Sequence, residues 1–225
     1  MASIKLLEQS QFQLSRLKTE FRYSVWIHLQ RSYPENSDQT QAIFIHIPKT
    51  AGTSLYNLIG YTGIGHVTYR WYESRNASKF QQYFKFAFVR NPWDRLVSAF
   101  FYLKKGGSNA MDKHWANQKI VHYPDFDDFV KGWLHEKNID NYFHFVPQYK
   151  FICDNSFRIK MDYIGRFERL DQDFKIISEK LGLDCQLPYV NQSKRRAYQD
   201  YYSSETAAIV AKAYQKDIEL FNYQF

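Results

Sequence analysis

The sequence predicts an α/β domain in which a mostly parallel central sheet is flanked by helices, giving three layers. Two apolar runs, at residues 42–47 and 84–89, are short and rich in β-branched or aromatic residues, as in buried parallel strands. Each run is followed by a polar turn and then by apolar residues at helical spacing. Such a succession is half of a βαβ unit, so we expect a parallel sheet with ligands at the carboxyl ends of its strands.

The remaining elements follow from the same patterns. Pro92 suits the first turn of a helix that runs through Leu103. The polar stretch from Gly106 to about Tyr123 predicts a mobile or substrate-facing loop. The other expected elements are a helix from the first polar turn to Gly60, helices near 126–134 and 174–181, a strand at 163–167 and a last helix at 205–221.

Length and composition indicate a folded domain at residues 41–225 and an N-terminal helical extension at 1–40. The chain has 225 residues, of which 44% are hydrophobic and 19 are Phe, so it can form a core and is not intrinsically disordered. Apolar residues at helical spacing in 4–31 predict an amphipathic helix that packs on the domain, or else an arm for homodimer formation or membrane-surface binding. Residues 33–38 predict a polar loop.

The charge and the apolar runs limit the partners. A formal net charge of +7 favours anionic ligands. The basic residues are spread along the chain, with tight clusters only at 104–105 and 194–196, so we do not expect a nucleic-acid partner. No run of 18 apolar residues and no secretory signature occurs, which predicts a cytoplasmic protein without a transmembrane segment.

Cysteine and histidine spacing indicates no metal centre. Cys153 and Cys185 lack metal-ligand spacing and are too few for a disulfide framework, so both are interpreted as buried thiols. The histidines also lack the short spacings of a metal site. We therefore expect activity that is independent of metal ions.

The segment 48–54 is the first candidate phosphate site. It lies between a predicted strand and a predicted helix, where free backbone N–H groups and the helix dipole favour an anion. Gly52 allows close approach of the backbone, and Lys49 can neutralise charge. The nucleotide-hydrolase P-loop places its lysine late in the loop, whereas this segment places it first. On its own the segment could also be an ordinary polar turn.

With its flanking residues, the string at 45–55 resembles the 5′-phosphosulfate loop of sulfotransferases that use 3′-phosphoadenosine 5′-phosphosulfate (PAPS), especially soluble bacterial relatives of Golgi carbohydrate sulfotransferases of the heparan and chondroitin type. The resemblance implies a P-loop-like fold, PAPS as cofactor, and a lysine that contacts the bridging oxygen during transfer. The residues implied to bind the cofactor here are Lys49, Thr50, Ala51, Gly52, Thr53 and Ser54.

A second segment, 88–100, resembles the 3′-phosphate site of the same family. The resemblance assigns Arg90 and Ser98 to that phosphate, and an arginine fork with a hydroxyl two turns into the next helix suits phosphate oxygens. For Arg95 we weigh an ion pair with Asp94 equally against a cofactor contact. Trp93 is interpreted as packing.

A third segment, 187–195, resembles the family's late segment that folds over the nucleotide. By that resemblance Lys194 and Arg195 would cap the cofactor, and a solvated basic turn is the alternative. Residues 164–170 and 221–225 also look like the family, so that the resemblance spans roughly 42–225.

The transfer also needs a base and an acceptor site. His66 is the first choice for the base, because it follows the first loop and helix and resembles a His-x-Thr segment of the family, and an imidazole titrates near neutral pH. His144 is the second choice. His144 and Gln148 resemble a His-x-x-Pro-Gln segment near the acceptor, so both are expected to bind substrate. His46 lies in the predicted strand and is interpreted as structural.

The sequence therefore predicts a PAPS-dependent sulfotransferase that acts by in-line displacement on an acceptor hydroxyl, on a glycan or glycolipid. A P-loop-like nucleotide kinase using the same basic residues is the first alternative, and the early position of Lys49 argues against it. The second alternative is a non-catalytic basic module that binds nucleic acid or a membrane surface, for which binding would weaken steeply with salt.

Overall fold

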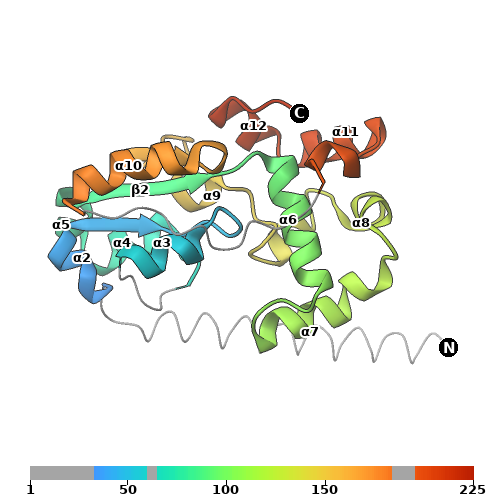
Figure 1. Ribbon diagram of the computed structural model, residues 1–225, viewed down its shortest axis with the longest axis horizontal. Helices are drawn as coiled ribbons and strands as arrows, with labels where there is room; N and C mark the ends of the chain where they lie inside the picture. Colours follow the sequence, from blue (N-terminus) through green and yellow to red (C-terminus); the bar gives the residue numbers. More distant parts are fainter. Residues whose placement is uncertain (1–32, 60–64, 184–195) are drawn as a thin grey trace.

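The computed structural model describes residues 33–59, 65–183 and 196–225 (Figure 1). At its centre lie three parallel strands, β1 (Ala42–Ile45), β2 (Phe84–Val89) and β3 (Tyr163–Arg166), in the order β1-β2-β3. Ala42 is aligned with Phe84, and Phe86 with Tyr163. The predicted α/β class with a parallel central sheet is confirmed.

Helices cover both faces of this sheet. Phe44 and Phe86 contribute to one core, with α3 (Gly52–Ile59) and α10 (Leu170–Leu181), and Figure 1 shows α10 alongside β2. The intervening strand residues belong to a second, larger core. It includes residues of α4 (Tyr69–Arg75), α5 (Ala77–Gln82), α6 (Pro92–Lys104), α8 (Phe126–Trp133) and α9 (Tyr149–Ile152). Because side chains alternate across a strand, two cores on opposite faces make the three predicted layers.

Further short helices complete the described chain. They are α2 (Glu35–Thr40), α7 (Ala110–Gln118), α11 (Ser204–Ala213), α12 (Gln215–Phe221) and single 3₁₀ turns at Ile120–His122, Ile139–Asn141, Phe167–Arg169 and Tyr198–Tyr201. The predicted strands and the helices at Pro92, 126–134 and 174–181 are confirmed, with boundaries that differ by a few residues.

Three local predictions were wrong. The stretch 106–123 is not an irregular loop, because it holds α7, which begins where the Asn109 side chain accepts a hydrogen bond from the backbone N–H of Asp112. The predicted loop at 33–38 overlaps α2. The helix at 205–221 is divided at Tyr214, whose backbone leaves the helical region while its side chain stays buried. Apolar spacing continues across that break, so it does not reveal the division.

Several predictions lie outside the described residues: the N-terminal helix at 4–31 and its homodimer role, Cys185, Lys194 and Arg195. Cys153 is described and is 4% exposed, and burial raises the pKa of its thiol to about 11. Within the described ranges there is no helix of the length and apolar character needed to cross a membrane. The same ranges contain no group of three or more His, Cys, Asp or Glu side chains placed to hold a metal ion.

Candidate active site

The first phosphate segment forms a tight loop between β1 and α3. Lys49 and Ala51 both have left-handed backbones, with φ of 70° and 67°. Such conformations cost about 1–3 kcal/mol in a residue other than glycine and gather at ligand-binding sites. Thr50 is fully buried, and its hydroxyl donates to the Ile47 carbonyl at 2.9 Å, which closes the turn. Left-handed turns direct backbone N–H groups toward a common point and so favour an anion.

Gly52 is fixed by a neighbour that the sequence did not indicate. A Cβ at this position would lie 1.9 Å from the ring of His46, so any side chain would displace that histidine. Of the two hydroxyl residues that follow, Thr53 is exposed and Ser54 is 9% exposed. The loop therefore packs directly against the ring of His46 at the end of β1.

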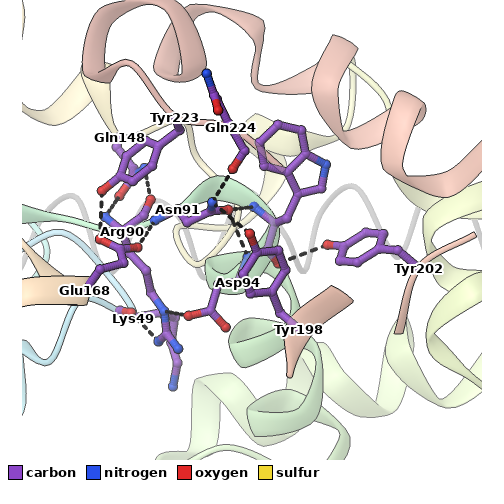
Figure 2. Close-up of polar contacts among 11 residues, drawn as sticks. Lys49, Arg90, Asn91, Asp94, Gln148, Glu168, Tyr198, Tyr202, Tyr223 and Gln224 are labelled. Carbon is purple, nitrogen blue, oxygen red and sulfur yellow. Dashed lines mark hydrogen bonds and ion pairs between the residues drawn. The ribbon is translucent and has the colours of Figure 1, made fainter. Parts of the chain in front are cut away.

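Arg90 joins the two predicted phosphate segments (Figure 2). Its Nη1 donates to the carbonyl oxygen of Lys49 at 3.0 Å, across 41 residues of sequence. Its Nε donates to Asp94 Oδ2 at 2.7 Å, and its guanidinium lies 3.7 Å from the centre of the Phe167 ring. The ion pair of Asp94 is therefore with Arg90, and the interpretation as an Asp94–Arg95 pair was wrong.

The backbone of Arg90 is held by Gln148, which is fully buried. The Gln148 Oε1 accepts from Arg90 N at 2.9 Å, and its Nε2 donates to Arg90 O at 2.8 Å. At the next residue, the Asn91 N–H donates to Glu168, and the Asn91 side chain donates to the carbonyl of Gln224 (Figure 2). Gln148 thus lies beside Arg90, and its predicted contact with a substrate stays a prediction.

Helix α6 places the other predicted residues of this segment. Ser98 is half-buried one turn beyond Asp94, and residues four apart share a face of a helix. Trp93 is 4% exposed and its indole donates to the Ala207 carbonyl, in agreement with a packing role. Arg95 is 1% exposed. Its guanidinium donates to the carbonyls of His144, Phe145 and Val146, so it fixes the chain next to Gln148.

Three histidines from distant parts of the chain lie together. The ring centres of His46 and His66 are 4.3 Å apart, those of His66 and His144 are 6.0 Å apart, and His66 stacks on Phe143 at 4.9 Å. The structure thus brings the two candidate bases into one cluster. It also adds His46, which the sequence suggested only as a strand residue.

The contacts of His66 define its protonation. Its Nδ1 lies 3.0 Å from the His46 carbonyl oxygen, and since a carbonyl only accepts, Nδ1 carries the hydrogen and Nε2 keeps a lone pair. Burial, and next the neighbouring His144, lower the pKa of His66 to about 3. His66 is therefore neutral at pH 7, with one nitrogen able to accept a proton.

Three polar residues of the site were missed in the sequence. The Lys49 Nζ lies 3.7 Å from the centre of the Tyr102 ring. The hydroxyl of Tyr102 donates to Asp112, which also accepts from Tyr142 and lies 3.1 Å from His144 Nε2. Tyr102, Asp112 and Tyr142 match no motif, and only the folded chain brings them to the lysine and the histidines.

The family model that matches this chain describes sulfotransferases, and two of the chain's curated relatives are named as sulfotransferases. The sequence matches the model of the Sulfotransferase family over residues 36–224. Carbohydrate sulfotransferase 10 of Rattus norvegicus is 26% identical over 174 residues, which cover 65% of this chain and 48% of the relative. Human carbohydrate sulfotransferase 9 is 26% identical over 160 residues, covering 63% of this chain and 34% of the relative. The chain thus spans half or less of the length of these curated relatives.

Among solved structures, the crystal structure of mouse sulfotransferase SULT7A1 complexed with PAP has a TM-score of 0.41 and 12% sequence identity, over 81% of this chain and 88% of that chain. The family match covers β1, β2 and β3 and both of the segments that Arg90 joins. Because it extends over most of the sequence, this chain belongs to the sulfotransferase family.

Proposed function

We propose that this chain transfers a sulfuryl group from PAPS to an acceptor hydroxyl on a carbohydrate. The observation that carries the proposal is the hydrogen bond from Arg90 Nη1 to the Lys49 carbonyl. It brings together two segments that would each bind one phosphate end of the same nucleotide. A single-phosphate ligand would need only one of them.

The residues present fit PAPS. The left-handed turn at Lys49 and Ala51 suits the 5′-phosphosulfate, with Thr50, Gly52, Thr53 and Ser54 completing the loop. Arg90 and Ser98 suit the 3′-phosphate, since Arg90 is preorganised by Asp94 and by Gln148. Bound PAPS would supply the sulfuryl group, whose bond to the 5′-phosphate oxygen breaks as its bond to the acceptor oxygen forms.

Lys49 supports this reaction through its charge. Its ammonium lies against the Tyr102 ring, beside the loop that would hold the phosphosulfate. A cation in a partly buried site interacts more strongly with a developing negative charge than it does in water. Lys49 therefore neutralises charge on the leaving phosphate.

His66 takes the acceptor's proton. The His46 carbonyl holds Nδ1 in its protonated form, so the lone pair on Nε2 is available. The low pKa keeps His66 unprotonated at neutral pH, although it also makes His66 a weak base. His144 lies in the same cluster and remains the second candidate.

The acceptor class rests on the relatives and on the aromatic character of the site. The curated relatives are named as carbohydrate sulfotransferases. Phe143 packs on His66, and Tyr102 lies beneath Lys49, so aromatic rings border the reacting groups. Aromatic rings beside a few placed polar groups are typical of small-molecule sites, and the names of the relatives support a glycan or glycolipid acceptor.

Calorimetric titration with 3′-phosphoadenosine 5′-phosphate (PAP), AMP and ATP, without added metal, tests the donor site. We expect PAP to bind more tightly than AMP or ATP, and Arg90→Ala to weaken PAP by at least tenfold, because a hydrogen bond to a charged group is worth about 1.5–3 kcal/mol. Arg158→Ala removes an exposed arginine and serves as the charge-matched control. Equal affinity for PAP and AMP contradicts the proposal, and tighter binding of ATP, tested in a separate titration with Mg²⁺ as well, favours a kinase.

A further inference from the structure

Asp112 is a buried carboxylate beside the histidine cluster that the proposed function leaves without a role. It has no exposed surface and lies in the first turn of α7. Burial tends to raise the pKa of Asp112, but hydrogen bonds from His144, Tyr102 and Tyr142 outweigh that effect and hold the pKa below its usual value. The group is therefore an ionised carboxylate at neutral pH.

The chain before α7 is shaped around this carboxylate. Gly107 has φ of +68°, and a Cβ there would lie 2.1 Å from the Asp112 Cβ. The Asn109 side chain donates to Asp112 Oδ2 at 2.8 Å and accepts from the Asp112 N–H at 2.8 Å. Residues 106–112 thus fold closely around the Asp112 side chain and do not form the mobile loop expected from their composition.

One connection of Asp112 leads to Lys49. The hydroxyl of Tyr102 donates to Asp112 Oδ2, and the ring of the same tyrosine lies 3.7 Å from the Lys49 Nζ. An ammonium over an aromatic face is attracted by about 0.5–2 kcal/mol, depending on its hydration. The carboxylate thus sets the position of the ring on which the lysine rests.

The other connection leads to His144. Its Nε2 lies 3.1 Å from Asp112 Oδ1, and because a carboxylate only accepts, Nε2 carries the hydrogen and Nδ1 the lone pair. The side chain of His144 is 5% exposed, and its Nδ1 has no hydrogen-bond partner among the described residues. A buried nitrogen without a partner is costly, which indicates a donor that the site gains with its substrates.

We propose that Asp112 is a positioning residue of the transfer site, which fixes the Nε2–H form of His144 and holds Tyr102 beneath Lys49. The lone pair on His144 Nδ1 then accepts a hydrogen bond from a hydroxyl of the acceptor. Asp112 thereby links Lys49, which lies at the leaving phosphate, to His144, which binds the acceptor. The inference rests on the proposed function, and it adds a residue that neither phosphate segment contains.

The test combines histidine side-chain NMR with PAP titration of the full chain. In the unsubstituted protein, we expect His144 to show a downfield, slowly exchanging ring N–H at Nε2, because a carboxylate accepts it. Asp112→Ala should abolish that signal and weaken PAP binding about two- to fivefold, through the loss of order at Lys49. The N–H of His66 at Nδ1, held by the His46 carbonyl, is the internal reference and should persist.

Two tyrosine variants separate the connection to Lys49 from a general disturbance of the carboxylate. Tyr102→Phe and Tyr142→Phe each remove one hydrogen bond to Asp112, but only the ring of Tyr102 contacts the Lys49 ammonium. We expect weaker PAP binding in Tyr102→Phe alone, and this pair decides the question if Asp112→Ala does not fold. Equal effects in the two variants, or an unchanged His144 signal in folded Asp112→Ala, overturn the inference. Absence of PAP binding in the unsubstituted protein overturns the proposed function itself.

Discussion

The surroundings of Arg90 and those of the three histidines are built differently. Around Arg90 the polar groups are matched: Gln148 uses both ends of its amide on the Arg90 peptide, and Asp94 pairs with the guanidinium (Figure 2). Around the histidines, the Lys49 ammonium lies over the Tyr102 ring, and His144 Nδ1 has no hydrogen-bond partner within residues 33–59, 65–183 and 196–225. Under the proposed function, the first region would hold a fixed phosphate, and the second would keep a lone pair for the acceptor.

A single stretch of chain, residues 144–149, connects the two regions. It begins with His144 of the cluster and includes Gln148 at the Arg90 peptide. Its carbonyls accept from Arg95, and Tyr214 donates to the carbonyl of Phe145. The two regions therefore share a support, so a change in that support should affect both of them, while changes within one region should leave the other intact.

The largest effect is expected from Asp217→Ala in this shared support. Asp217 is fully buried on α12 and accepts from the backbone N–H groups of Gln148 and Tyr149, at 2.7 and 2.8 Å. Its removal leaves one buried and one partly buried donor without this partner, each worth about 1–3 kcal/mol, so we expect the free energy of unfolding to fall by about 3 kcal/mol in urea denaturation. PAP affinity should fall as well.

Asp140→Ala provides the matched control for that measurement. Asp140 also pairs with a partner, Lys150 at 2.5 Å, but this pair lies at the surface, where the two side chains are 48% and 37% exposed. An exposed ion pair contributes about 0–1 kcal/mol. Similar losses in the two variants would show that residues 144–149 do not depend on Asp217.

A second prediction concerns the contact between the loop and the histidines. In Gly52→Ala the new Cβ would overlap the His46 ring, and we expect a loss of about 1–3 kcal/mol in unfolding free energy. Adding His46→Ala should recover most of that loss, since it removes the clashing ring, and a double-mutant cycle measures the coupling. If the two substitutions are additive, His46 does not account for the glycine.

The sequence predicted the strand–turn–helix setting of both candidate phosphate segments, because that setting depends on short, local strings. Each string follows a strand whose apolar composition identifies it, and the match to the sulfotransferase family covers both. The histidine region was predicted only in part, because its members come from distant elements. Asp112 contacts Tyr102 only when α6 and α7 pack together, and Tyr102 contacts Lys49 only when α6 lies beside the loop after β1. Local patterns carry no signal for such contacts.

Two local misassignments have different physical causes. Asp94 and Arg95 are adjacent and opposite in charge, which suggested a pair, but helix geometry places residues one apart on different sides. Arg90, at four residues from Asp94, is the partner that the helix allows. The polar stretch at 106–123 was taken for a loop because most of its polar residues face solvent, and its composition does not reveal the helix that Asn109 caps at the buried Asp112.

The smallest effect is expected from a change of pH. It tests whether burial keeps His66 neutral in the folded protein. The folded pKa of His66 is about 3, below its usual value of 6.5, so the unfolded chain binds more protons between these values. Stability therefore rises with pH across that window, and it is lost as the pH falls below about 6.5. Between pH 7.5 and 5.5 we expect His66 to account for a loss of about 1 kcal/mol.

Urea denaturation of His66→Asn at the two pH values measures this contribution. Asparagine can still donate to the His46 carbonyl but does not titrate, so the loss between pH 7.5 and 5.5 should be smaller in the variant by about 1 kcal/mol. The control is His122→Asn, because His122 is exposed, and its loss should match that of the unsubstituted protein. If His66→Asn loses as much stability as the unsubstituted protein, His66 is not held neutral by burial, and the contrast between the two regions does not extend to ionisation.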